Sequence, residues 1–146
     1  MFSGHGIKKE KIMERFSISM DSELLGKFDD HLSAHGYSNR SEAVRDMVRK
    51  ALVDDEWESG QEVVGVITLV FDHHQRQLQE KLTELQHGYH CLIVSSTHVH
   101  LDHHNCLEVI ITRGEASRVQ RLADRLKATK GVKSSELATA STGRKL

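Results

Sequence analysis

The sequence contains no proline and only two cysteines, Cys91 and Cys106. Domain boundaries must therefore be read from glycines and helix caps, and no disulfide framework is expected. The longest apolar run, Val63 to Phe71, is too short to span a bilayer, and Met1 to Arg15 lacks the apolar segment of a signal peptide. The formal net charge of -1 argues against a general polyanion-binding protein. We therefore expect a cytoplasmic protein with reduced thiols, in which any contact with nucleic acid comes from a local pattern.

Residues 13–20 alternate between apolar and polar side chains, which is typical of a half-buried strand. The apolar side consists of Phe16, Ile18 and Met20, and the polar side consists of Arg15, Ser17 and Ser19. Helix signals follow, because Asp21 or Ser22 can cap a first helix that ends at Gly36, and residues 39–42 resemble a capping box that begins a second. This strand-helix-helix unit of about forty residues is too small to bury its own core, so we expect it to dimerise.

After an acidic connection around residues 54–61, the pattern changes to alternating strands and helices, which indicates a second domain. The expected strands are Glu62–Phe71, Cys91–His100, Cys106–Thr112 and Val132–Thr139, and the expected helices are Gln75–Gln86 and one that Gly114 begins. The resulting βαββαβ order is that of a ferredoxin-like domain, and the fold class is therefore α+β. Open sheets of this kind have bare faces and edges, which favour oligomers.

The polar face of the N-terminal strand suggests one way to contact DNA. A two-stranded antiparallel ribbon, with one strand from each of two subunits, fits the major groove of B-DNA. In such a ribbon Arg15 can donate two hydrogen bonds to a guanine edge, and the hydroxyl groups of Ser17 and Ser19 can donate or accept. The alternative is that this face is simply the solvated side of a strand, and the alternation alone does not decide between the two.

Histidine and cysteine concentrate between Gln86 and Cys106. His98 and His100 are two residues apart in an expected strand, so their imidazoles project from one face, and Cys106 follows across a short connection. Residues that pair across antiparallel strands lie about 4.5–5.5 Å apart at Cα, near enough to share one ion. The candidates for a fourth ligand are His87, His73, His74, His90, Cys91, His103 and His104. These donors suit Zn(II) in a tetrahedral site, or Ni(II) or Cu(II) in a planar one, and the residues themselves leave the ion open.

The string from His98 to His103 also matches the HxHxDH pattern of zinc hydrolases of the metallo-β-lactamase type. Those enzymes take further histidine and aspartate ligands from downstream segments. Here no histidine follows His104, and Asp124 is the sole later aspartate. Because no catalytic triad or phosphate-binding glycine loop is present either, we expect that the protein is not an enzyme.

Three features together resemble the nickel-responsive regulators of the NikR family: the strand with Arg15, Ser17 and Ser19, the string GYSNRSEAVRD from Gly36 to Asp46, and the string THVHLDHHNCLE from Thr97 to Glu108. The resemblance covers nearly the whole chain. It implies a ribbon-helix-helix DNA-binding domain fused to an ACT-like ferredoxin domain, which we expect at residues 13–55 and 62–140, with a linker at 56–61 and a tail at 141–146. The flexible arm expected at residues 1–12 departs from the family pattern, because only some relatives carry one. The resemblance also implies a homotetramer built as a dimer of dimers.

By the same resemblance, one Ni(II) per subunit would sit in a square-planar site at a subunit interface. Three of its ligands would be His98, His100 and Cys106 from one subunit, and the fourth would be His87 from a neighbour. Secondary cation contacts near DNA would fall on Glu42 and Asp46. The function implied is nickel-dependent repression of nickel-uptake genes, with operator DNA as the partner. Two alternatives stay open: a zinc or copper buffering protein, and a regulator whose ACT-like domain senses a metabolite.

Overall fold

A computed structural model describes residues 12–146, which fall into two compact units that divide within helix α2, between Ala43 and Val44. The expected arm at residues 1–12 therefore lies outside the described residues, apart from Ile12. In the part of the chain that the structure describes, no helix combines the length and the apolar character needed to cross a membrane.

The N-terminal unit contains helix α1 (Ser22–Ala34) and the start of helix α2 (Arg40–Glu58). Both helices begin at the predicted caps. The Asp21 carboxylate accepts a hydrogen bond from the Leu24 backbone N–H at 2.9 Å, and Asn39 Oδ1 accepts one from the Glu42 backbone N–H at 2.9 Å. Gly36, with φ of 74°, ends the first helix in the left-handed conformation that its position predicts.

Residues 12–20 differ from the prediction, because the structure assigns no strand to them. A strand is defined by hydrogen bonds to a neighbouring strand, and the predicted neighbour belongs to a second copy of the chain. The apolar side of the segment is accordingly open to solvent: the side chains of Phe16, Ile18 and Met20 are 75%, 54% and 38% exposed. Pairing of this segment into a ribbon remains a prediction.

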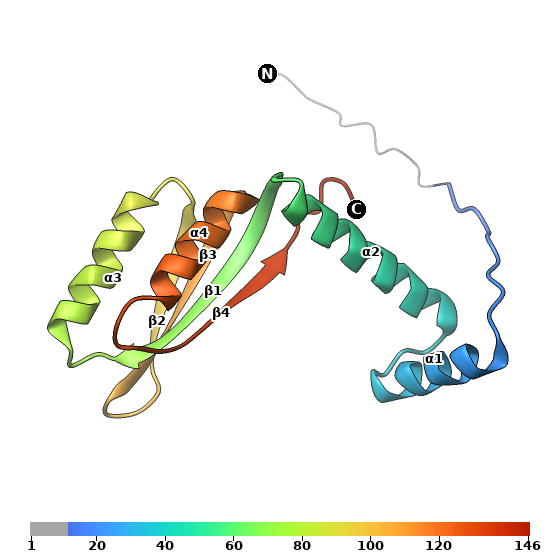
Figure 1. The fold of residues 1–146 in the computed structure, drawn as a ribbon, viewed down its shortest axis with the longest axis horizontal. Coiled ribbons are helices and arrows are strands. Elements are labelled where there is room, and N and C mark those ends of the chain that lie inside the picture. Colours follow the sequence, from blue (N-terminus) through green and yellow to red (C-terminus); the bar gives the residue numbers. More distant parts are fainter. Residues whose placement is uncertain (1–11) are drawn as a thin grey trace, which may run out of the picture. The chain divides into compact units, whose positions relative to one another are not determined.

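The C-terminal unit contains the rest of α2, followed by a four-stranded antiparallel sheet in the order β2-β3-β1-β4 with two further helices (Figure 1). After α2, its elements in chain order are β1 (Glu62–Asp72), α3 (Arg76–Gly88), β2 (Ile93–His100), β3 (Asn105–Glu115), α4 (Ala116–Lys127) and β4 (Val132–Ala140). This is the ferredoxin-like arrangement, and it confirms the α+β fold class and the expected place of the last strand at an edge.

The two faces of the sheet differ in their cover. Both α3 and α4 pack on one face, where they bury a core with β1 and β3. The buried residues of this core are Ile67, Leu69, Phe71, Leu78, Leu82, Cys106, Ile110, Leu122, Ala123 and Leu126. The opposite face carries half-buried and exposed apolar side chains, which are Val64, Val66, Val70, Val99, Leu107, Val109 and Ile111.

Two local expectations were wrong. Gly114 does not begin a helix: β3 continues through it to Glu115, because β1 offers a pairing partner for every residue as far as Glu62. The acidic connection around residues 54–61 is largely helical, because α2 extends to Glu58. The last turn of this helix contacts the end of β4, where the Trp57 indole N–H donates to the Ala140 carbonyl at 3.1 Å. The domain limits given by the sequence stay predictions.

Candidate metal centre and DNA-binding segment

The register of β2 against β3 decides where the three nearby candidate ligands lie. His100 is the Cα partner of Cys106, and His98 is the partner of Glu108. Residues that pair across a ladder share a face, as do residues two apart along a strand. His98, His100 and Cys106 therefore lie on the same face of the sheet, the one that α3 and α4 cover.

Cys106 is the buried member of this set, with 0% of its surface exposed, whereas His98 and His100 are exposed on the edge strand. Phe71 pairs with Cys106 from the other side, and its ring contacts the His98 ring edge-on at a centroid distance of 5.7 Å. Burial raises the pKa of the Cys106 thiol, and the carboxylates of Glu108 and Asp72 raise it further. Without a cation beside it, this sulfur is a thiol at neutral pH.

Glu108, two residues after Cys106, is a buried carboxylate that sequence reasoning missed. Its Oε1 atom accepts hydrogen bonds from Gln86 Nε2 at 2.9 Å and from Ser96 Oγ at 2.8 Å. The carboxylate thus joins the last turn of α3 to both strands of the β2–β3 hairpin. A signal for it existed, because the alternation of the Cys106–Thr112 strand places Glu108 on the same side as Cys106 and Ile110.

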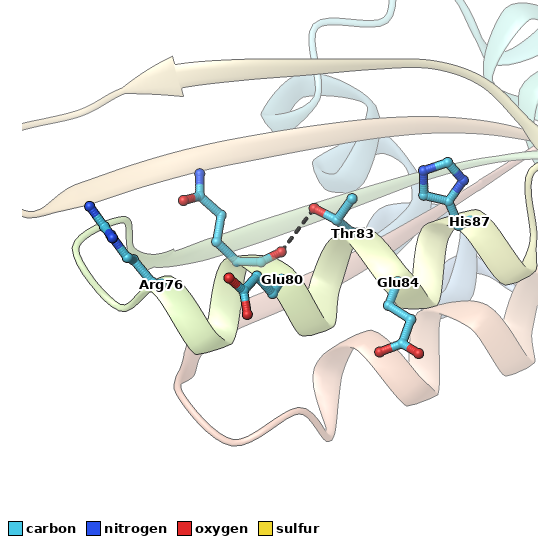
Figure 2. Close-up of a pocket in the computed structure, with 6 residues that line it drawn as sticks. Arg76, Glu80, Thr83, Glu84 and His87 are labelled. Atoms are coloured by element: carbon cyan, nitrogen blue, oxygen red, sulfur yellow. Dashed lines mark hydrogen bonds between the residues drawn. The ribbon is translucent and has the colours of Figure 1, made fainter.

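His87, the fourth candidate ligand, directly follows Gln86 in α3 and is exposed. It lines an open pocket along this helix together with Arg76, Gln79, Glu80, Thr83 and Glu84 (Figure 2). Across the described residues, no three of the side chains of His87, His98, His100 and Cys106 bring ligand atoms within 4.8 Å of one another in a single subunit.

The remaining candidate ligands separate into two groups. His90 and Cys91 follow α3, where the His90 Nδ1 atom lies 3.1 Å from the His87 carbonyl and Cys91 Sγ lies 3.3 Å from Arg118 Nη2. The four loop histidines, namely His73, His74, His103 and His104, lie close together where β1 ends and the hairpin turns. Of all described residues, only Asp72, His74 and His104 form a group of three possible ligands within 4.8 Å.

The predicted DNA-contacting residues are accessible. Arg15, Ser17 and Ser19 are exposed in the extended segment before α1. Glu42 and Asp46, the predicted secondary cation contacts, both belong to α2, where Asp46 forms an ion pair with Arg49 at 2.7 Å.

Comparisons with known proteins match each half of the chain to a family. Residues 64–140 match the family described as the NikR C terminal nickel binding domain, and residues 14–55 match the ribbon-helix-helix proteins of the copG family. A protein of Desulfotalea psychrophila called a putative nickel-responsive regulator is 57% identical over 135 residues, which are 92% of this chain and 99% of that protein. One of Geobacter sulfurreducens with the same description is 52% identical over 90% of this chain and 96% of its own.

A solved structure shares the fold alone. An uncharacterized protein from Thermotoga maritima superimposes with a TM-score of 0.50 at 12% sequence identity, and it covers 54% of this chain and 98% of its own.

Proposed function

This chain belongs to the family of nickel-responsive transcriptional regulators, and from that premise we propose that it binds one Ni(II) per subunit through His98, His100, Cys106 and the His87 of a neighbouring subunit. Nickel-dependent regulation through a ribbon-helix-helix domain is the activity of the family, which is not a class of enzymes. The finer proposal concerns which residues hold the ion and how they act.

The observation that carries the proposal is the pairing of His100 with Cys106, which puts two imidazoles and one thiol on a single face of the hairpin. Imidazole nitrogen and thiolate sulfur are borderline and soft donors that suit Ni(II), whereas a hard ion such as Mg²⁺ prefers oxygen. The position of His87 supports an interface site, because its side chain is exposed on α3 and does not gather with the other three in one subunit. A square-planar site of this composition is the arrangement we propose.

The proposed assembly is a tetramer made from two DNA-binding dimers. The N-terminal unit leaves apolar side chains exposed, among them Phe16, Ile18 and Leu24, which a second copy would cover. The uncovered face of the C-terminal sheet, with exposed Val99 and Ile111, offers a second apolar surface for joining dimers. In the ribbon that results, Arg15, Ser17 and Ser19 would contact base edges in the major groove.

When bound, nickel supplies a link between two subunits. The Glu108 carboxylate holds Gln86, so the end of α3 that carries His87 is fastened to the same hairpin that carries Cys106. An arrangement of subunits that brings His87 to the hairpin of its neighbour is therefore favoured over one that does not, by a coupling of about 1–3 kcal/mol. We propose that this arrangement sets the two ribbon dimers for operator binding, with Glu42 and Asp46 as secondary cation contacts. We propose that the protein acts in the cytoplasm and represses nickel-uptake genes when nickel is plentiful.

The test measures nickel content and DNA binding on the same samples. Operator DNA is selected from a random pool with the nickel-loaded protein, and its binding is then followed by fluorescence anisotropy with and without nickel. We expect R15A to lose operator binding and keep its nickel, and the double variant H98A/C106A to lose both the nickel and the effect of nickel on DNA binding. The matched control is C91S, which removes the other cysteine and keeps both activities.

The two alternatives give different results. A zinc or copper buffering protein would select no DNA sequence, and R15A would be indistinguishable from the unmodified protein in every assay. A metabolite-sensing regulator would keep its full nickel affinity in H98A/C106A. The first result would contradict the proposed DNA-binding role, and the second would contradict the proposed nickel site.

A further inference from the structure

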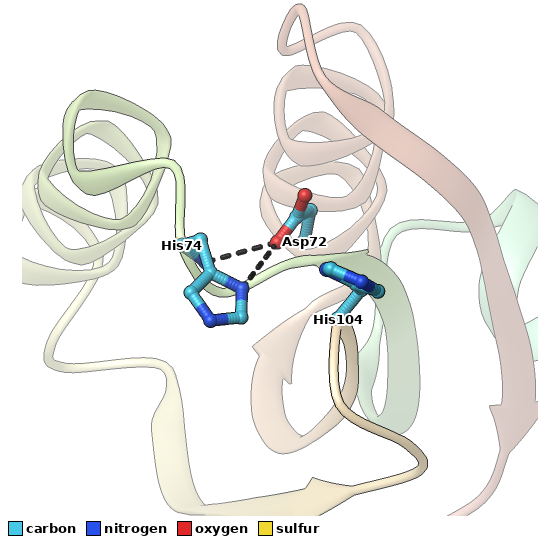
Figure 3. A group of neighbouring side chains, drawn as sticks. All are labelled: Asp72, His74 and His104. Atoms are coloured by element: carbon cyan, nitrogen blue, oxygen red, sulfur yellow. Dashed lines mark hydrogen bonds and ion pairs between the residues drawn. The ribbon is translucent and has the colours of Figure 1, made fainter.

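A second cluster of metal-binding side chains lies outside the proposed nickel site, where two loops meet. Asp72 is the last residue of β1, His74 belongs to the turn between β1 and α3, and His104 belongs to the loop of the β2–β3 hairpin. One carboxylate oxygen and one nitrogen from each ring all lie within 4.8 Å of one another (Figure 3). His74 and His104 are exposed, and Asp72 is half-buried.

Backbone and side-chain hydrogen bonds hold these three residues near one another. Asp72 Oδ1 accepts a hydrogen bond from the His74 backbone N–H at 3.0 Å and lies 3.2 Å from His74 Nδ1. The two loops are joined directly, because the His73 backbone N–H donates to the His104 carbonyl at 3.2 Å. The cluster is therefore built from segments far apart in the sequence that the sheet brings together.

The hairpin loop that carries His104 is itself fixed by a carboxylate. Asp102 accepts hydrogen bonds from the His104 and Asn105 backbone N–H groups and from Asn105 Nδ2, each at 2.8 Å. These three hydrogen bonds lower the pKa of Asp102 to about 2. These hydrogen bonds fix the turn of the hairpin loop on both sides of His104.

The distances within the cluster are close to those that a metal ion needs. Transition-metal ions bind nitrogen and oxygen at about 2.0–2.2 Å, which places neighbouring ligand atoms of one ion roughly 3.0–3.6 Å apart. The ligand atoms of the cluster lie within 4.8 Å of one another, so rotation of the exposed His74 and His104 side chains would bring them toward that spacing. Two imidazoles and one carboxylate favour Ni(II), Zn(II), Co(II) or Cu(II) over Mg²⁺ or Ca²⁺, and water would fill the remaining positions.

We propose that Asp72, His74 and His104 form a second site for a divalent transition-metal ion, weaker than a site that contains a thiolate. Three ligands, two of which are exposed histidines, bind less tightly than four at an interface, so this site fills at higher metal concentration. An ion there would join the end of β1 to the hairpin loop, which lies between His100 and Cys106 in the sequence. Occupancy of the second site would thus restrain the segment that carries two of the proposed nickel ligands.

The test counts bound ions in four proteins by equilibrium dialysis against nickel chloride over a wide concentration range. We expect two ions per subunit in the unmodified chain, one weakly bound ion in H98A/C106A, one tightly bound ion in H74A/H104A, and none when all four changes are combined. X-ray absorption at the nickel edge should show sulfur in the shell of H74A/H104A and none in that of H98A/C106A.

The matched control is H31A/H35A, which removes another pair of neighbouring exposed histidines, whose rings stack in α1 at 4.0 Å. This variant should keep both ions. The proposal is overturned if H98A/C106A binds no nickel at any concentration used, or if adding H74A and H104A to it leaves its weak binding unchanged. Failure of the proposed primary site would look different, because H98A/C106A would then bind as many ions as the unmodified chain.

Discussion

Nickel binding through Cys106 should release one proton from the thiol, and nickel affinity should therefore rise with pH. Burial, followed by the charges of Glu108 and Asp72, raises the pKa of Cys106 above its ordinary value of 9.0. Below that pKa the free protein carries the protonated thiol, whereas metal ligation requires the thiolate. Nickel affinity is therefore lowest at low pH, and it rises until the pH passes the pKa of the free thiol.

The loss of one proton sets how strongly nickel affinity depends on pH. At pH 7 the thiol lies at least 2 pH units below its pKa, so its deprotonation opposes binding by about 2.7 kcal/mol or more, at 1.36 kcal/mol per unit. Between pH 7.5 and 8.5 the thiol of Cys106 is still below its raised pKa, so each nickel ion that binds must displace its proton. The dissociation constant for nickel should then fall about tenfold for each unit of pH between 7.5 and 8.5.

The assay is competition with a chelator of known proton affinity, supported by calorimetry in two buffers of different ionisation enthalpy. Calorimetry should report close to one proton released per nickel at pH 8. The matched control is C91S, which removes the exposed cysteine and should keep both the slope and the proton. A dissociation constant that does not change between pH 7.5 and 8.5, or a slope that disappears in C91S, would refute the assignment of Cys106 as the thiolate ligand.

Three further predictions concern stability, and chemical denaturation measures each of them. L122A removes a fully buried side chain from the core beneath α4 and should lower the free energy of unfolding by about 2–5 kcal/mol. N39A removes the acceptor of the Glu42 backbone N–H at the start of α2 and should cost about 1 kcal/mol. G131A should cost more than about 1 kcal/mol, because φ is 105° there and the new Cβ would lie 2.9 Å from Leu78 Cδ2.

Each of these predictions has a control at the same position or next to it. R121A, on the exposed side of α4, should change stability by no more than about 0.5 kcal/mol. N39S keeps a capping oxygen and should recover most of the loss in N39A. K130A leaves the backbone at Gly131 unchanged and should be near neutral. Equal losses in a variant and its control would contradict the stated cause.

Much of the C-terminal fold could be predicted from the sequence because its signals are local and periodic. The apolar run from Val63 to Phe71 and the helical spacing of Leu78, Leu82 and Leu85 each indicate one element, and the βαββαβ order then leaves a single common topology. The two helix starts at Asp21 and Asn39 were also predictable, because a cap depends on one side chain and a backbone N–H three residues later.

The errors occurred where distant pairing overrides a local signal. Gly114 resembles a helix start in isolation, but pairing with Val63 in β1 keeps it in a strand. The strand expected at residues 13–20 is a different case, because its partner belongs to a second copy of the chain and its pairing stays a prediction. His74 and His104 were candidate ligands from the sequence, but their grouping with Asp72 was not predicted. About thirty residues separate the two segments, and only the sheet register brings them together.

Glu108 shows how the fold can join the proposed metal ligands to a movement of the subunits. Its buried carboxylate depends on two donors, Gln86 on α3 and Ser96 on β2, and a buried charge left without them is costly. The end of α3 therefore cannot separate from the hairpin without exposing or stranding that charge. Since His87 follows Gln86 directly and Cys106 lies two residues before Glu108, the proposed interface ligand and the proposed hairpin ligands of one subunit belong to segments that Glu108 holds together. A metal bound between two subunits would therefore act on α3 and the β2–β3 hairpin of each subunit together, and not on flexible side chains alone. An ion can change the arrangement of the DNA-binding segments only if it acts on whole domains in this way.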